Sequence, residues 1–178
     1  GIGSIIAIVS TINGTNEQIK RNLIGAGNNA VLVQLYQGEY AVDMDYTVLP
    51  EVYRALDESL KDDILALDNA EKVSFFYSRN AYESIYYVNT GLSSGQILGI
   101  DSDYMGVYGY KINKGRGFTE ADYKNYNKVA VIDSVTADEL FQGEDPVGKI
   151  IEVRGETFSV IGVMSLTSDF KPVIQSID

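Results

Sequence analysis

Apolar positions along the chain fall into short continuous runs separated by polar, glycine-rich breaks, with one longer stripe at helical spacing. The stripe recurs at every fourth residue and predicts an amphipathic helix over Leu49–Leu67. Short runs rich in Val, Ile, Phe and Tyr predict strands. The predicted strands are Ala30–Tyr36, Val73–Tyr77, Ile85–Asn89, Gln96–Ile100, Val129–Ile132, Lys149–Val153 and Thr157–Val163. Strands and helices interleaved in this way predict an α+β fold in two small layers.

The first apolar run, Gly1–Ile12, is consistent with two structures. It is shorter than the roughly 20 apolar residues that cross a bilayer, so it fits the outer end of a spanning helix. A short buried helix or strand fits the same residues equally well. A polar helix is predicted over Asn13–Ile24, and the Gly- and Asn-rich stretch after it is typical of a helix end.

Local signals in the second half of the chain predict two more helices, a hairpin and a boundary. Thr119 is a favourable N-cap for a short helix through Asp122, and a further helix is predicted over Ser134–Phe141. The predicted apolar side of this helix is Val135, Leu140 and Phe141. Arg154–Glu156 has the composition of a hairpin turn. The stretch Gly91–Gly95 (GLSSG) is the most linker-like in the chain and predicts a subdomain boundary.

The composition then excludes several kinds of binding and catalytic site. The chain has 178 residues, 25 Asp and Glu against 14 Lys and Arg, and a formal net charge of -11, which disfavours nucleic acid as a partner. It contains no cysteine and no histidine, so thiol nucleophiles, imidazole bases and Cys or His zinc sites are excluded. Gly143–Lys149 approaches a phosphate-binding loop, but Ile150 replaces the required Ser or Thr and a strand is predicted next. No cofactor is expected.

Acidic and aromatic residues supply the candidate contacts. Asp43 with Asp45, and Asp101 with Asp103, are spaced like carboxylate ligands, but the later oxygen ligands of a calcium loop are absent. Tyrosines, 13 in all, gather between residues 75 and 110, where they suit either a binding surface or simply a sheet. The candidate partner contacts are Tyr77, Tyr82, Tyr86, Tyr87, Tyr104 and Tyr108, with Asp57 and Glu58 on the predicted acidic helix.

An ordered set of motifs then carries a family resemblance. The set comprises Gly115-Arg116-Gly117-Phe118-Thr119 followed by Asp122, Val129–Ile132, Leu140-Phe141, Asp145-Pro146-Val147-Gly148-Lys149 and Phe158–Val163. In this order and spacing the chain resembles the extracytoplasmic domain of MacB-type ABC transporter permeases, a group that includes lipoprotein-releasing permeases. The motif residues Gly115, Arg116, Phe118, Pro146 and Gly148 shape turns and anchor them, so they predict a fold and carry no active site.

The resemblance implies a particular domain organisation. Residues 1–23 would be the outer end of a transmembrane helix and its stalk. Residues 24–90 with 166–178 would form a subdomain similar to the porter domain of multidrug pumps, and residues 91–165 would form a small α/β subdomain inserted in it. Family domains usually continue with a second β-α-β return to the membrane, and only a short tail follows the Phe158–Val163 strand here. The porter-like part is therefore expected to be incomplete.

The function implied by the resemblance is mechanical rather than enzymatic. The domain would sit on the outer side of the cell membrane, held by flanking helices of a dimeric transporter. An ATP-binding subunit or domain would drive those helices, and an adaptor (membrane-fusion) protein would dock outside the membrane to support export, including of antimicrobial drugs. Two alternatives from other classes stay open at this point. One is a secreted carbohydrate- or peptide-binding domain that uses the tyrosines, and the other is an acidic hydrolase that uses paired carboxylates.

Overall fold

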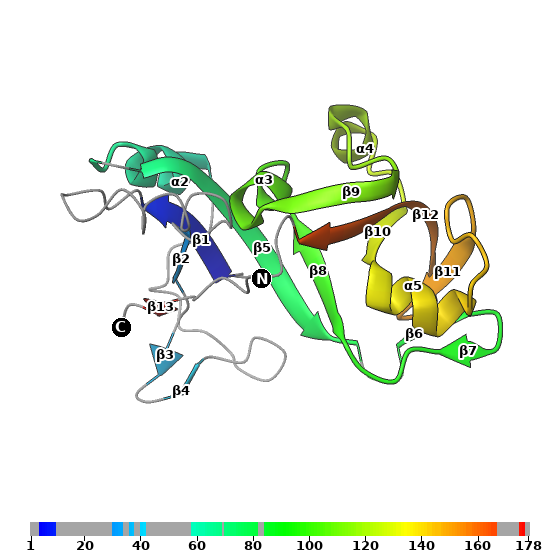
Figure 1. Cartoon of the computed structure of the whole chain (residues 1–178). Helices are drawn as coiled ribbons and strands as arrows, with labels where there is room; N and C mark the ends of the chain where they lie inside the picture. The colour runs from blue at the N-terminus through cyan, green and yellow to red at the C-terminus, as the bar shows by residue number, and fades with distance from the viewer. Residues whose placement is uncertain are drawn as a thin grey trace, which may run out of the picture. The chain divides into compact units, whose positions relative to one another are not determined.

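The computed structural model describes residues 4–9, 30–33, 36–37, 40–41, 58–68, 70–81, 84–166 and 175–176. The chain forms two compact units. Unit 1 comprises residues 1–79, 98–109 and 167–178, and unit 2 comprises residues 80–97 and 110–166. The elements of both units follow one another along the chain as strands with short helices between them (Figure 1). The predicted mixed α and β fold is confirmed.

Unit 1 is built on a five-stranded sheet with the order β13-β2-β1-β5-β8. β1 pairs antiparallel with both β2 and β5, and β13 pairs parallel with β2. A separate two-stranded ribbon is formed by β3 and β4. The elements are β1 (Ser4–Val9), β2 (Ala30–Val33), β3 (Tyr36–Gln37), β4 (Tyr40–Ala41), α2 (Glu58–Leu65), β5 (Ala70–Asn80), β8 (Gln96–Ile100), α3 (Tyr104–Tyr108) and β13 (Gln175–Ser176).

The first apolar run corrects one expectation. Residues Ser4–Val9 form strand β1, so the assignment of residues 1–23 to the end of a membrane helix is wrong for this segment. The run lies between β2 and β5, with Ile6 opposite both Leu32 and Ser74. β-branched residues such as Ile and Val are favoured in strands, and backbone pairing with β2 on one side and β5 on the other holds this segment as a strand. The predicted helix Asn13–Ile24 lies outside the described residues.

Unit 2 is built on a six-stranded sheet in which β10, β12, β11, β6 and β7 lie side by side and β9 pairs with the second half of β12. Among the described pairings of this sheet, only the β10–β12 pair is parallel. The elements are β6 (Ile85–Tyr87), β7 (Thr90–Gly91), β9 (Tyr110–Gly115), α4 (Glu120–Lys124), β10 (Val129–Asp133), α5 (Ser134–Phe141), β11 (Ile150–Val153) and β12 (Glu156–Leu166).

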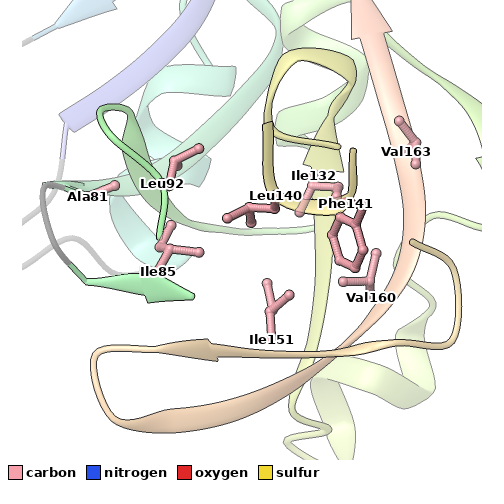
Figure 2. Close-up of a cluster of buried hydrophobic side chains, with 9 residues drawn as sticks. All are labelled: Ala81, Ile85, Leu92, Ile132, Leu140, Phe141, Ile151, Val160 and Val163. Carbon is pink, nitrogen blue, oxygen red and sulfur yellow. The ribbon is translucent and has the colours of Figure 1, made fainter. Parts of the chain in front are cut away.

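Helix α5 packs on this sheet and closes the core of unit 2. Leu140 and Phe141 point from α5 toward side chains of the sheet (Figure 2), and both are almost fully buried. The buried cluster consists of Ala81, Ile85, Leu92, Ile132, Leu140, Phe141, Ile151, Val160 and Val163. Val135, predicted on the same apolar side, is 69% exposed, so that prediction is wrong. At 100° per residue, Val135 lies about 140° from Leu140 and about 120° from Phe141 around the helix axis, away from the side that faces the sheet.

Several boundaries differ from the predicted ones. The stretch Gly91–Gly95 lies inside unit 2, and the chain instead passes between the units at 79/80, 97/98, 109/110 and 166/167. The predicted strand Ile85–Asn89 ends at Tyr87, because Val88 adopts a left-handed conformation with φ of 54° and begins a tight turn into β7. The β11–β12 hairpin is confirmed, with Arg154 and Gly155 both at positive φ, as a two-residue type I′ turn requires.

Candidate functional site

The candidate tyrosines of unit 1 do not form one exposed surface. Tyr77 on β5 is 41% exposed, whereas Tyr104 at the start of α3 is only 3% exposed. The Tyr104 ring packs 5.2 Å from the ring of Phe76 and 4.8 Å from that of Tyr108, measured between centroids. Tyr104 is therefore a core residue of unit 1 and is not available to a partner, which corrects its assignment as a contact. Tyr108, half-buried, belongs to the same aromatic stack.

The candidate tyrosines of unit 2 pack against their own unit, Tyr86 against the β6–β7 hairpin and Tyr87 against helix α5. Tyr86 lies across Gly91 in the neighbouring strand, where a Cβ atom would come within 2.8 Å of its ring. Tyr87 stacks on Phe141 with ring centroids 4.3 Å apart, and its hydroxyl donates a hydrogen bond of 3.1 Å to Glu144. Both are half-buried. The tyrosine cluster of the sequence is thus divided between two units, and Tyr82 lies outside the described residues.

Helix α2 presents the acidic face that the sequence predicts. Glu58, Asp62 and Asp63 are exposed, and none of the described α2 residues is buried. Lys61 differs from its neighbours, since only 12% of its side chain is exposed. Its ammonium group lies 2.8 Å from Asp101 and 5.2 Å from the ring centroid of Phe75. Asp57, the other acidic candidate from the sequence, lies outside the described residues.

In the described part of unit 1, the Asp101 carboxylate accepts several hydrogen bonds, although the sequence offers it only as a weak metal ligand. Oδ1 accepts hydrogen bonds from the Ser74 hydroxyl at 2.7 Å and from the amides of Asp103 and Tyr104 at 3.1 Å each. Oδ2 accepts from the Phe75 amide at 2.7 Å. Burial alone raises the pKa of Asp101, but the bonds from Lys61, Phe75 and Ser74 outweigh it and leave the pKa below its usual value. Asp101 is therefore held by donors from β5, from α2 and from the turn into α3.

The GRGFT motif is organised around a second carboxylate, that of Asp122. Arg116 binds Asp122 through both guanidinium nitrogens, at 2.6 and 3.2 Å. Thr119 caps helix α4, as the sequence predicts, and it does so in a capping box with Asp122. The Asp122 carboxylate also accepts from the Thr119 amide and hydroxyl, both at 2.8 Å, and from Asn127 at 3.0 Å. Phe118 is half-buried, with its ring 6.0 Å from that of Tyr123.

This network predicts a specific pH dependence. The hydrogen bonds from Arg116, then Asn127 and Thr119, hold the pKa of Asp122 well below its usual range. A carboxyl whose pKa is lower in the folded state stabilises the fold above its unfolded pKa of about 3.9, and that contribution fades as the pH falls toward its folded pKa. We therefore expect Asp122→Asn to lower the thermal midpoint at pH 7, and the difference from the parent chain to shrink steadily below about pH 4.

Thermal unfolding of both chains between pH 7 and pH 2 measures this difference. Glu120→Gln is the matched control, because Glu120 is exposed on the same helix and should give a midpoint close to that of the parent at every pH. A difference for Asp122→Asn that stays constant with pH would contradict the assigned pKa direction.

The remaining motif residues shape turns, as the sequence predicts. Gly115 has φ of 71°, and a Cβ atom there would lie 2.3 Å from the carbonyl oxygen of Ile161. Gly148 has φ of 86° in the turn before β11, and Pro146 in the same turn is buried. The motif therefore marks two backbone positions that need glycine and one buried anchor. All of these residues belong to unit 2.

Comparison of the sequence with models of known protein families identifies one family that matches this chain. The sequence model of the MacB-like periplasmic core domain matches residues 1–175, almost the whole chain. The chain belongs to this family. The resemblance read from the ordered motifs is thereby confirmed.

Named relatives of the MacB-like chain are transporter components. The permease YvrN of Bacillus subtilis, described as an uncharacterized ABC transporter permease, is 34% identical over 169 residues. The macrolide export ATP-binding/permease protein MacB of Neisseria gonorrhoeae is 31% identical over 171 residues. Each match covers 92% of this chain but only 40% of YvrN and 24% of the Neisseria protein. The chain thus spans less than half the length of these relatives.

Solved structures of the family share the fold. The periplasmic region of MacB from Actinobacillus actinomycetemcomitans superposes with a TM-score of 0.56 at 22% identity, over 93% of this chain and 62% of that one. The extracellular domain of YknZ, a transporter from Gram-positive bacteria, gives 0.54 at 24% identity, over 68% and 60%. Within the ranges described here, no helix combines the length and apolarity needed to cross a membrane.

Proposed function

We propose that this chain is the extracytoplasmic domain of an ABC export permease, carried on the outer side of the cell membrane by flanking helices. The family match over residues 1–175 carries the proposal. The Bacillus relatives are ABC transporter permeases, and the Neisseria relative carries ATP-binding and permease functions in one protein. ATP hydrolysis would accordingly reside in a separate domain or subunit, and a dimeric transporter would move these domains.

Two features support a role in transmitting movement and docking a partner. Two described ion pairs that include a largely buried side chain, Lys61–Asp101 and Arg116–Asp122, hold loops and helices of their own unit in place. The surface is acidic overall, which suits a partner that presents basic side chains. We propose that an adaptor protein docks on the exposed acidic face of α2, whose exposed acidic residues are Glu58, Asp62 and Asp63.

A charge-reversal experiment tests this docking face. We expect the triple variant Glu58→Lys, Asp62→Lys, Asp63→Lys to weaken binding of the transporter's adaptor protein by about tenfold or more, and salt to weaken binding of the parent chain. Biolayer interferometry with the purified adaptor and the 178-residue chain measures both effects. The matched control, Glu120→Lys with Asp138→Lys and Glu152→Lys, makes the same change in charge on exposed residues of unit 2.

Two outcomes would reject parts of the proposal. Equal weakening by both triple variants would show that overall charge, and no α2 face, governs the interaction. Parent-level binding by the α2 variant would remove α2 as the docking face while leaving the family assignment untouched.

A further inference from the structure

Helix α4 of unit 2 ends in a turn that holds an unfavourable residue at its central position. The amide of Tyr126 donates to the carbonyl of Tyr123 at 3.2 Å, and the amide of Asn127 donates to the carbonyl of Asp122 at 2.9 Å. This pair of hydrogen bonds is the Schellman motif that closes many helices. Its left-handed position is occupied by Tyr126, with φ of 52°, where glycine is the usual residue and a bulky side chain is rare.

The fold does not compensate for this backbone strain through the Tyr126 side chain. Tyr126 is 89% exposed. Within the described part of the chain its ring stacks on no other ring and its hydroxyl has no hydrogen-bond partner. A left-handed conformation costs free energy at a residue that carries a Cβ atom, and residues held in this way are concentrated at functional sites. A large aromatic side chain kept in this conformation and exposed to solvent therefore indicates a role in binding.

The turn that carries Tyr126 is firmly fixed to its own unit. Asn127, the next residue, donates twice to Asp122, from its amide to the carbonyl at 2.9 Å and from its side-chain nitrogen to the carboxylate at 3.0 Å. Asp122 is bound in turn by both guanidinium nitrogens of Arg116. A side chain presented on a fixed turn loses less freedom on association, which favours a specific contact.

The side chains beside the ring define the chemistry of a partner. Residues 124–128, the KNYNK turn, are all exposed and none is acidic, although the whole chain has a net charge of -11. Lys128 forms an ion pair with Glu156, whereas the Lys124 ammonium and the Asn125 side-chain amide have no partner among the described residues. A complementary surface would offer a recess for the ring and carboxylate or carbonyl oxygens at its rim.

We propose that Tyr126 anchors a second docking surface, the KNYNK turn, and inserts its ring into an acidic pocket of the adaptor protein. The inference rests on the proposed function for the identity of this partner. Tyrosine is enriched among the residues that dominate the energetics of protein interfaces, because its ring buries a large apolar area and its hydroxyl can still form a hydrogen bond. The pocket is opposite in charge to the adaptor surface proposed to meet α2, so the two contacts can be tested separately.

Tyr126→Gly distinguishes a binding role from a structural one, because the two roles predict opposite changes in stability. Glycine suits φ of 52°, so the thermal midpoint of this variant should rise by about 2 °C. Binding of the purified adaptor to the 178-residue chain, measured by biolayer interferometry, should weaken by about tenfold or more, a usual loss for an aromatic anchor. Tyr126→Phe keeps the ring and should bind within about fivefold of the parent chain.

Val88→Gly is the matched control for the glycine substitution. Val88 also lies at positive φ, 54°, and is exposed in a turn of unit 2, so glycine relieves the same kind of backbone strain there. We expect Val88→Gly to raise the midpoint and to leave adaptor binding unchanged. Equal weakening of binding by the two glycine variants would overturn the proposal, because loss of the Tyr126 ring would not be its cause.

Lys124→Glu tests the charge of the pocket without changing the ring. It should weaken adaptor binding by about fivefold, whereas Lys111→Glu, the same change at an exposed position of β9, should leave it near the parent level. Equal weakening by these two variants would show that overall charge governs the contact, which contradicts an acidic pocket at Lys124.

The remaining outcomes separate this proposal from the docking of α2. Parent-level binding by Tyr126→Gly overturns the proposal, as does a thermal midpoint that falls together with binding, since Tyr126 would then be a structural residue. If only the α2 charge-reversal variant weakens binding, the KNYNK turn is rejected and the α2 face stands. If only Tyr126→Gly weakens it, the α2 face is rejected and the KNYNK turn stands. A parent chain that does not bind the adaptor rejects both.

Discussion

Replacing Gly115 with alanine is expected to destabilise the chain by about 3 kcal/mol, several times the effect of an ordinary surface substitution. Two costs add at this position. The backbone has φ of 71°, where a residue with a Cβ atom is disfavoured by about 1 to 2 kcal/mol. The new Cβ would also lie 2.3 Å from the carbonyl oxygen of Ile161 and 3.0 Å from the Cα of Gly162, so β9 and β12 would have to separate where they pair.

Gly148→Ala isolates the first of these costs. Gly148 also lies at positive φ, 86°, but a Cβ atom there meets nothing within 4 Å, so only the conformational cost of about 1 kcal/mol is expected. Equilibrium unfolding in urea of the parent and both variants, followed by circular dichroism, measures the difference. If the two substitutions cost the same, the close approach of β9 to β12 does not limit the choice of residue at Gly115.

Elements whose signals are local could be predicted from the sequence. The strand Gln96–Ile100, the helix Ser134–Phe141, the Thr119 cap and the Arg154 hairpin all lie where composition and spacing place them. Each depends on residues within a few positions of one another, such as an N-cap and the amide that it binds. The N-terminal strand β1 differs, because an apolar run of six residues becomes a strand only through its neighbours in the sheet, which the run itself does not specify.

The predictions about function also held where they rested on local signals and failed where they depended on burial. The ordered turn motifs identify the family because glycine and proline are required by local backbone geometry, as Gly115 and Gly148 show. The tyrosine cluster misled because sequence proximity says nothing of burial: Tyr104 packs in unit 1, while Tyr87 stacks on a helix of unit 2. The role of Asp101 depends on Lys61 and Ser74, 40 and 27 residues earlier in the chain. An aspartate followed by a turn was the only signal that could have suggested it.

Leu140→Ala is expected to cost about 3 kcal/mol, because it removes the side chain that carries α5 into the core of unit 2. Leu140 is 1% exposed and lies among the sheet residues Ile85, Ile151 and Val160 (Figure 2). Truncation leaves a cavity that the surrounding strands can fill only in part, since packing in a core is already close to its limit. Hydrogen exchange of β10, β11 and β12 should accelerate by on the order of a hundredfold where it proceeds through global opening of this unit.

Val135→Ala, on the same helix, is the control for Leu140→Ala. Val135 is 69% exposed, so its truncation is expected to change stability by no more than about 0.5 kcal/mol. Exchange in β1 and β5, which belong to unit 1, should be unaffected by either variant if each unit is held by its own core. Acceleration of exchange in both units by Leu140→Ala would mean that they unfold as one cooperative body, and the two cores could not then be treated as independent sources of stability.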